Sequence, residues 1–284
     1  MSVHIEIRTN PAAIAALTIE EIAALEHLRY GISDGAYVLA QGETGKYNIL
    51  FDGNRIGRGF EVTLEERKIT IALPLPNTPH DIALCYRLTE SLCRRLGLEH
   101  FSRDGEEIPL GQAASLITLD LQASVGALRD MEQQIEADSE HTVSVFGALN
   151  PIVVGPRERT AIGGTLDGFE AMLDQMQRLD AWYAVPRFFR LEDGPVVGMY
   201  FIGEDMPVIL PRDPAPAYQQ IEGVDGYYVR IPGHRDIPYA LFWDGVTHEG
   251  PYDATHDLIR MSADQCAHLG TCCAYNMRTR QLME

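Results

Sequence analysis

The feature that most restricts the fold is a change in the spacing of apolar residues between residues 60 and 97. Apolar and polar residues alternate in FEVTL (60–64) and ITIAL (69–73), as in strands with one buried face. After three prolines the spacing becomes helical, and the predicted buried stripe consists of Ile82, Cys85, Leu88, Leu92 and Leu96. Cys93 lies beside this stripe. The chain must therefore pack an amphipathic helix against an antiparallel meander.

Capping signals mark the ends of the predicted helices. Thr78 and Asp81 begin the helix after Pro79, and Gly97 ends it. Near the N-terminus, Asn10-Pro11 is a start signal, and Thr18 with Glu21 forms a capping box. We expect this N-terminal helical run to end at Gly31.

The two patterns recur along the rest of the chain. Further helices are predicted at 118–137 and 163–179, and a short one after Ser262. Asp52-Gly53 suits a tight hairpin turn. Further strands are predicted at 37–40, 47–51, 142–148, 182–191, 196–202, 206–211, 227–232, 237–243 and just before Ser262.

The order of these elements indicates the fold class. Strands and helices do not alternate one by one, so a doubly wound parallel sheet is not expected. We predict an α+β fold in which antiparallel sheet meanders pack with several amphipathic helices. Residues 1–140 and 141–284 each contain such a mixture. They form either two α+β halves or one continuous domain.

The charge of the chain limits its partners. The net charge is −18 at pH 7, and the basic residues are scattered and include only two lysines, Lys46 and Lys68. Such a chain repels phosphate backbones and anionic lipids, so we expect neither nucleic acid nor membrane as a partner. A strongly acidic surface favours rapid association with a cationic protein.

The N-terminus and the cysteines indicate a compartment. Residues 1–21 contain acidic residues and a proline where a signal peptide would need a basic flank and an apolar run. Five cysteines are an odd number and few for a disulfide framework, so reduced thiols are expected. We therefore predict a cytoplasmic protein.

Glycine-rich segments offer little evidence for a cofactor. GETGKYN (42–48) has the wrong spacing for a phosphate loop, and GNRIGRG (53–59) leads into a strand where a dinucleotide motif would lead into a helix. No cofactor is expected. Gly163 and Gly164 do precede a predicted helix, and their amides are candidates for binding an anion, although a glycine pair before a helix is a weak signal for a ligand.

The segment HEGPYDATHD (248–257) holds the candidate catalytic residues. Histidine and carboxylate side chains supply general acids and bases, and four of them occur here: His248, Asp253, His256 and Asp257. The alternative is a solvated loop whose polar residues face water, with Tyr252 inserted below them.

A cysteine cluster follows in QCAHLGTCCAYN (265–276). Cys266, His268, Cys272 and Cys273 are zinc-ligand types, but their spacing matches no common structural zinc site, and we assign no metal. Two other interpretations are open. The thiols either pack among apolar neighbours or act as reactive groups.

Three segments carry a resemblance to a known family. GRGFEV (57–62), ITIALPLPNTPHDIALCY (69–86) and FGALNPI (146–152) are similar to segments of a family of uncharacterised bacterial proteins, a domain of unknown function. The resemblance implies a bacterial intracellular protein. It implies no activity and no site residues, because the shared residues are of packing and turn types.

Two functional hypotheses follow. The first is a protein of immunity or accessory type that binds a protein partner through its acidic surface, and this surface favours a basic partner. The alternative is a hydrolase-like enzyme with a site built from the C-terminal histidines and aspartates. The sequence gives neither the partner or substrate nor the oligomeric state.

Overall fold

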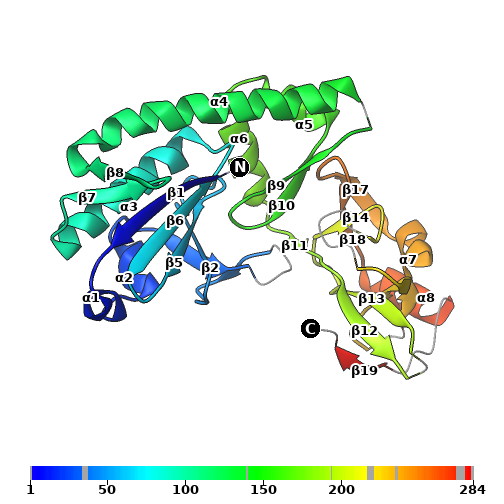
Figure 1. Cartoon of the computed structure of the whole chain (residues 1–284). Coiled ribbons are helices and arrows are strands. Elements are labelled where there is room, and N and C mark those ends of the chain that lie inside the picture. The colour runs from blue at the N-terminus through cyan, green and yellow to red at the C-terminus, as the bar shows by residue number, and fades with distance from the viewer. Residues whose placement is uncertain are drawn as a thin grey trace. The chain divides into compact units, whose positions relative to one another are not determined.

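The computed structural model describes residues 2–33, 38–138, 140–192, 194–215, 221–233, 236–272 and 279–282, with backbone only at 270–272 and 279–282 (Figure 1). The chain divides into two compact units, Met1–Arg178 and Leu179–Glu284. This division lies after the predicted one at residue 140. Residues 143–177 belong to the first unit because their apolar side chains share a core with the helix that ends at Ala137.

An eight-stranded antiparallel sheet forms the centre of the first unit. The strand order is β3-β2-β4-β5-β6-β1-β7-β8. β4, β5 and β6 are neighbours in sequence order, which confirms this part of the predicted meander, whereas β3 pairs with β2 at the edge of the sheet. The strands are β1 (Ser2–Arg8), β2 (Arg29–Ile32), β3 (Ala40–Gln41), β4 (Asn48–Phe51), β5 (Phe60–Leu64), β6 (Lys68–Pro74), β7 (His100–Arg103) and β8 (Glu106–Pro109).

The first strand was not predicted. β1 lies inside the sheet, where it pairs with β6 from Ser2↔Pro74 to Arg8↔Lys68 and with β7 on its other side. The predicted N-terminal helical run is two short helices, α1 (Pro11–Ala15) and α2 (Ile19–Ala24), and the capping box at Thr18 is present. Gly31 lies within β2, so the prediction that it ends a helix was wrong.

Two long helices lie against one another beside the sheet. α3 (Pro79–Leu96) begins and ends where its capping residues predict. Thr78 Oγ1 accepts a hydrogen bond from the Asp81 amide, and Gly97 is left-handed with φ 68°. Its buried stripe, including Cys85 and Cys93, packs with β1, β5 and β6 in one core. α4 (Ala113–Ala137) follows a short 3-10 turn, Leu110–Gln112, and contacts both α3 and the later helices (Figure 1).

The C-terminal half of α4 covers a second core. Leu128, Met131 and Ile135 pack there with Phe169 and Leu173. The elements around this core are β9 (Val143–Phe146), β10 (Pro151–Val154), α5 (Pro156–Ile162) and α6 (Leu166–Gln177). The predicted helix at 163–179 is α6, which Thr165 caps by accepting a hydrogen bond from the Gly168 amide.

The tight hairpin predicted at Asp52-Gly53 was wrong. β4 and β5 are antiparallel neighbours, but the loop 52–59 connects them. Asp52 Oδ1 accepts a hydrogen bond from the Asn54 amide (2.8 Å), which forms a local turn of another kind. The loop ends at Gly59, whose φ of 64° requires glycine; an added Cβ would lie 2.5 Å from the Leu50 carbonyl oxygen.

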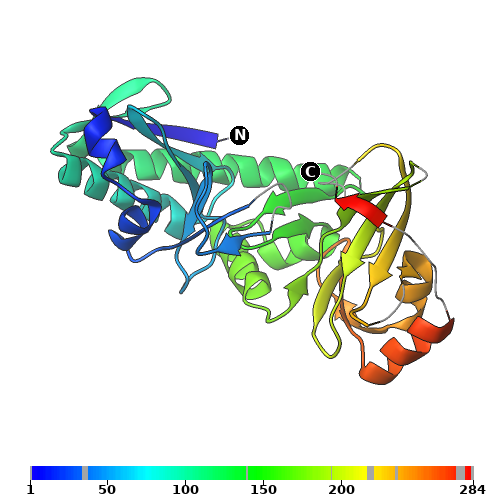
Figure 2. The same ribbon diagram turned by 90° about the horizontal axis from the view of Figure 1, so that it is seen from below.

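The second unit contains two sheets around one core. Their orders are β11-β14-β18-β17 and β16-β15-β13-β12-β19, and the pairs β11–β14 and β13–β15 are parallel. Figure 2 shows β19 at the edge beside β12. The strands are β11 (Trp182–Tyr183), β12 (Arg187–Leu191), β13 (Val196–Phe201), β14 (Val208–Pro211), β15 (Val224–Arg230), β16 (Ile237–Pro238), β17 (Thr247–Pro251), β18 (His256–Arg260) and β19 (Thr279–Leu282).

Two helices complete the second unit. α7 (Tyr239–Gly245) occupies most of a segment predicted as strand, because Tyr239 and Phe242 are three residues apart and both reach the core from one helix face. α8 (Ala263–Cys272) is the predicted short helix, and Ser262 Oγ accepts from the Gln265 amide. The α+β class is thus confirmed. In the part of the chain that the structure describes, no helix is long and apolar enough to cross a membrane.

Candidate functional site

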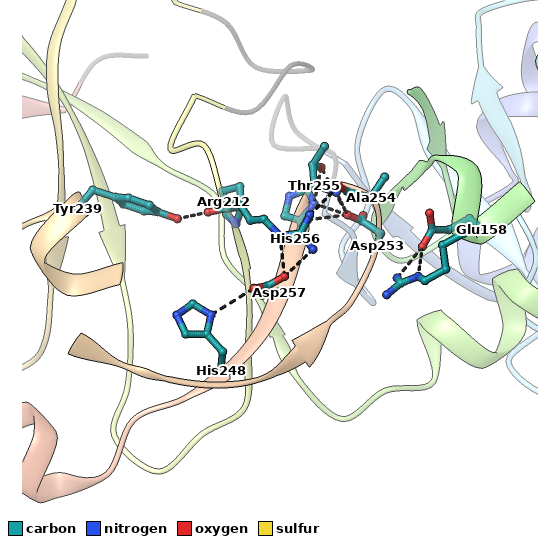
Figure 3. A network of polar contacts seen from close by, with 11 residues as sticks. Glu158, Arg212, Tyr239, His248, Asp253, Ala254, Thr255, His256 and Asp257 are labelled. Atoms are coloured by element: carbon teal, nitrogen blue, oxygen red, sulfur yellow. Dashed lines mark hydrogen bonds and ion pairs between the residues drawn. The ribbon is translucent and has the colours of Figure 1, made fainter. Parts of the chain in front are cut away.

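The four predicted catalytic residues lie on one hairpin, formed by β17, the turn 252–255 and β18. The register pairs Thr247 with Arg260 and Pro251 with Asp257. His256 and Asp257 are consecutive on β18, and side chains of consecutive strand residues point to opposite faces. The four residues therefore form two separate pairs (Figure 3).

The first pair is buried and extends to a tyrosine. Asp253 Oδ1 lies 2.9 Å from His256 Nδ1 and accepts hydrogen bonds from the Thr255 and His256 amides, both at 2.8 Å. On the other side of the imidazole, Tyr183 Oη lies 3.0 Å from His256 Nε2. The exposed fraction is 1% for Asp253 and His256 and 2% for Tyr183. The result is a buried row of carboxylate, imidazole and phenol.

Two neighbouring side chains hold this row in place. Thr255 Oγ1 lies 3.0 Å from His256 Nδ1, and Tyr252 packs edge-on against Tyr183 with ring centroids 6.3 Å apart. Burial, and then the nearby Asp253 carboxylate, raise the pKa of Tyr252 above its ordinary value. Tyr252 therefore stays neutral across the physiological range. The expectation that Tyr252 lies inserted below the loop is confirmed, whereas Asp253 and His256 are not solvated.

The second pair lies at the surface. Asp257 Oδ2 is 3.2 Å from His248 Nδ1, and Asp257 Oδ1 accepts from Arg212 Nε at 2.8 Å. His248 Nε2 is 3.0 Å from the Trp243 carbonyl oxygen, and the His248 ring stacks edge-on against Trp243. This arrangement is an ion-pair network that ties the hairpin to α7 and to the segment after β14. The polar groups of these side chains therefore already have hydrogen-bond partners within the network.

The two candidate anion-binding amides have partners within the first unit. The Gly163 amide donates to the Arg159 carbonyl (3.1 Å) at the C-terminus of α5, where Gly163 is left-handed with φ 61°. The Gly164 amide donates to Glu132 Oε1 of α4 (3.1 Å). A carboxylate of the chain itself thus occupies the position expected for an anion.

Cys266 is the cysteine of this cluster whose side chain the structure describes. Cys266 is buried in the core of the second unit with Leu269, as the packing interpretation expects. Burial raises the pKa of its thiol to about 11, so the reactive thiolate is scarce at neutral pH. His268 is exposed on the same helix. For Cys272, at the end of α8, only the backbone is described, and Cys273 lies outside the described residues. Among the described residues no cluster has a metal-ligand arrangement.

The first unit contains a buried polar cluster that the sequence analysis did not single out as a site. Asp81 Oδ2 accepts hydrogen bonds from the Arg58 amide (2.8 Å) and the Gly59 amide (3.0 Å). Asp81 Oδ1 is buried and has no hydrogen-bond partner among the described residues. Burial outweighs these hydrogen bonds and raises the pKa of the Asp81 carboxyl.

The Arg58 side chain connects the same cluster to two other loops. Its Nη1 donates to the Pro76 carbonyl (2.6 Å) and its Nε to the Phe146 carbonyl (3.0 Å), and burial lowers its pKa to about 10. Gln177 Nε2 donates to the Gly57 carbonyl (2.7 Å) and Gln177 Oε1 accepts from the Leu149 amide (2.7 Å). The three segments that carry the family resemblance therefore meet in space. The family resemblance of these three segments was the sequence signal from which the cluster could have been found.

Comparison with known proteins identifies a family. A family model described as "Domain of unknown function (DUF4299)" matches residues 2–269, and the chain belongs to this family. The predicted resemblance to an uncharacterised family is thus confirmed. No curated protein and no solved structure matches the chain.

Proposed function

We propose that the protein works by binding a cationic protein partner through its acidic surface. The observation that carries this proposal is the net charge of −18 combined with the way the structure uses its cations. Many of the arginines form ion pairs within their own unit. These pairs include Arg8–Glu6, Arg94–Glu90, Arg103–Asp120, Arg159–Glu136, Arg178–Asp174, Arg212–Asp257, Arg230–Asp236 and Arg260–Glu249.

The consequence is a surface with a surplus of carboxylates. Each internal ion pair removes one arginine as a contact for an external anion, and the remaining acidic residues give a long-range negative potential. Such a potential accelerates the encounter with a basic protein and selects against acidic ones. A role of immunity or accessory type, in which the chain neutralises a basic protein, is consistent with this potential.

The test is capture followed by reconstitution. The immobilised chain is incubated with an extract of its source organism, bound proteins are eluted with a salt gradient, and each is purified and mixed again with the chain. We expect a basic protein that rebinds at a fixed stoichiometry, with an association rate that falls steeply as ionic strength rises. Salt-independent binding of an acidic protein, or no stoichiometric partner, contradicts the proposal.

One observation favours the hydrolase-like alternative. In the row Asp253–His256–Tyr183 an imidazole lies between a carboxylate and a hydroxyl, an order that general-base activation of a nucleophile requires. In this alternative His256 takes the phenol proton while Asp253 orients and stabilises the imidazolium. A movement that exposes Tyr183 would be needed, because its exposed fraction is 2%.

A panel of p-nitrophenyl esters tests the alternative. If the row is catalytic, turnover by the purified chain falls at least about a hundredfold in Tyr183→Phe and in His256→Gln. Tyr47→Phe, at an exposed tyrosine of the first unit, is the control and should leave turnover unchanged. The absence of turnover, or turnover that survives Tyr183→Phe, removes this alternative.

A further inference from the structure

A shallow depression in the second unit combines apolar side chains with carboxylates. It has a volume of about 360 Å³ and lies where β11 meets the segment before β14. Its lining residues are Asp180, Ala181, Trp182, Asp205, Met206 and Pro207. The Trp182 amide donates to the Pro207 carbonyl (2.9 Å), and Trp182 pairs with Val208 in the parallel β11–β14 ladder. The backbone under the depression is therefore fixed by the sheet.

Two large apolar side chains of this depression remain in contact with water. The exposed fraction is 50% for Trp182 and 37% for Met206. The second tryptophan, Trp243, is partly buried and stacks on Tyr239 with an interplanar angle of 14°. Tryptophan and methionine are enriched at protein–protein interfaces relative to the rest of the surface, and tryptophan is one of the residues that most often dominate the binding energy there.

The carboxylates at the rim are available to an external cation. No cation forms an ion pair with Asp180 or Asp205 among the residues that the structure describes. The nearby Arg260 directs its Nη1 to the Asp205 carbonyl oxygen (3.2 Å) and pairs its Nε with Glu249 (2.7 Å). The Asp205 amide donates to the Met261 carbonyl (2.9 Å), which fixes this residue at its φ of 54°.

We propose that this depression is the docking site for an arginine side chain of the cationic partner protein. This inference rests on the proposed function, of which it names the contact point. The guanidinium plane stacks on the indole of Trp182, its methylene groups cover Met206, and its N–H groups donate to Asp180 and Asp205. Arginine suits the site better than lysine, because a planar guanidinium can stack and form several directed hydrogen bonds at once.

The two tryptophans provide an internal comparison for the test. The chain, labelled with nitrogen-15, gives two indole N–H signals, and Trp182→Phe assigns them. The probe is acetyl-Gly-Arg-Gly-Arg-Gly-amide, with the matching lysine and glutamine peptides as comparisons. We expect the arginine peptide to shift the Trp182 signal and leave the Trp243 signal in place. We expect the lysine peptide to bind several-fold more weakly and the glutamine peptide not to bind. Equal binding of all three, or a shift at Trp243 alone, overturns the inference.

Variants then identify the groups that bind. Asp180→Asn with Asp205→Asn, and separately Trp182→Ala, should each lower the affinity for the arginine peptide about fivefold to tenfold. Glu222→Gln, at an exposed acidic residue of the same unit, should not change it. Asp180, Asp205 and Trp182 are all exposed. Circular dichroism spectra identical to that of the parent chain establish that the variants fold. Unchanged affinity in both rim and tryptophan variants overturns the inference.

The same variants separate this inference from the proposed function. A basic partner that binds the parent chain in a salt-dependent manner, but binds the Asp180, Asp205 and Trp182 variants equally well, supports the proposed function and overturns the docking site. Failure to find any basic partner, with the peptide still bound at Trp182, instead overturns the proposed function.

Discussion

Among single residues, the buried carboxyl group of Asp81 should affect the stability of the fold more than an exposed charged side chain does. This carboxyl group accepts hydrogen bonds from two backbone amides of the loop before β5, and Asp81 lies in the first turn of α3. The residue therefore links the loop, the sheet and the helix. Removing an acceptor of this kind leaves buried amides without partners, which costs more than the bond itself contributes.

Asp81→Asn should change how stability depends on pH. The folded-state pKa lies above its ordinary value of 3.8, so this group stabilises the fold fully below pH 3.8, and its contribution is lost as pH rises through the folded-state pKa. Asparagine cannot ionise. The variant should therefore gain stability relative to the parent as pH rises above about 4, with a slope of up to about 1.4 kcal/mol per pH unit. Urea unfolding from pH 4 to 8 measures this difference.

Asp52→Asn is the matched control, with the opposite sign. Burial alone would raise the pKa of Asp52, but hydrogen bonds from the Asn54 amide and from His80 outweigh it and hold the pKa below 3.8. This group stabilises the fold above pH 3.8, and that contribution is lost as pH falls through the folded-state pKa. Parallel pH profiles for the two variants would contradict the assignment of Asp81 as the buried acid.

At the scale of elements, α4 has two very different faces. Leu128 has an exposed fraction of 2% and lies in the core with β9, β10 and α6, whereas Leu119 on the same helix has an exposed fraction of 47%. A side chain contributes to folding in proportion to the apolar area that it removes from water.

Leu128→Ala should lower the free energy of unfolding by about 2–5 kcal/mol, because it leaves a cavity in that core. Leu119→Ala, in the same helix and with the same chemistry, should change it by no more than about 0.5 kcal/mol. Urea unfolding followed by circular dichroism provides both values. Similar losses in the two variants would show that the core is not where the structure places it.

The sequence predicts those elements whose signals are local. Pro79 and Gly97 set the ends of α3, and Thr18 sets the start of α2, because a cap acts within one helical turn. YALFW in α7 is a short apolar run, which local spacing cannot assign to helix or strand. The residues of the candidate site were likewise predictable only where they are close in sequence. His256 and Asp253 are neighbours in sequence, whereas Tyr183 reaches them only through the order β11-β14-β18.

At the scale of the whole molecule, the first unit has its own complete cores. The sheet packs with α3, and the C-terminal half of α4 packs with residues 143–177. A segment with complete cores and its own backbone pairing is expected to fold by itself.

Residues 1–178 expressed alone should therefore unfold in a single cooperative transition in urea. A fragment ending at residue 140, the boundary predicted from sequence, is the control. It loses β9, β10, α5 and α6, so that Leu128, Met131 and Ile135 face water, and it should aggregate or unfold without cooperativity. Cooperative unfolding of the shorter fragment, or failure of the longer one, would contradict this division.

The inner position of β1 has a consequence for how the chain reaches its native state. The ribosome makes β1 before its two neighbours in the sheet, β6 and β7, which follow more than 60 and 90 residues later. The nascent chain must therefore keep VHIEI unpaired during that interval, when this exposed apolar edge is open to other chains. Chaperone binding to the nascent chain should therefore be strongest before β6 has left the ribosome and should decrease once β7 has emerged, which can be measured on ribosome-bound chains of increasing length.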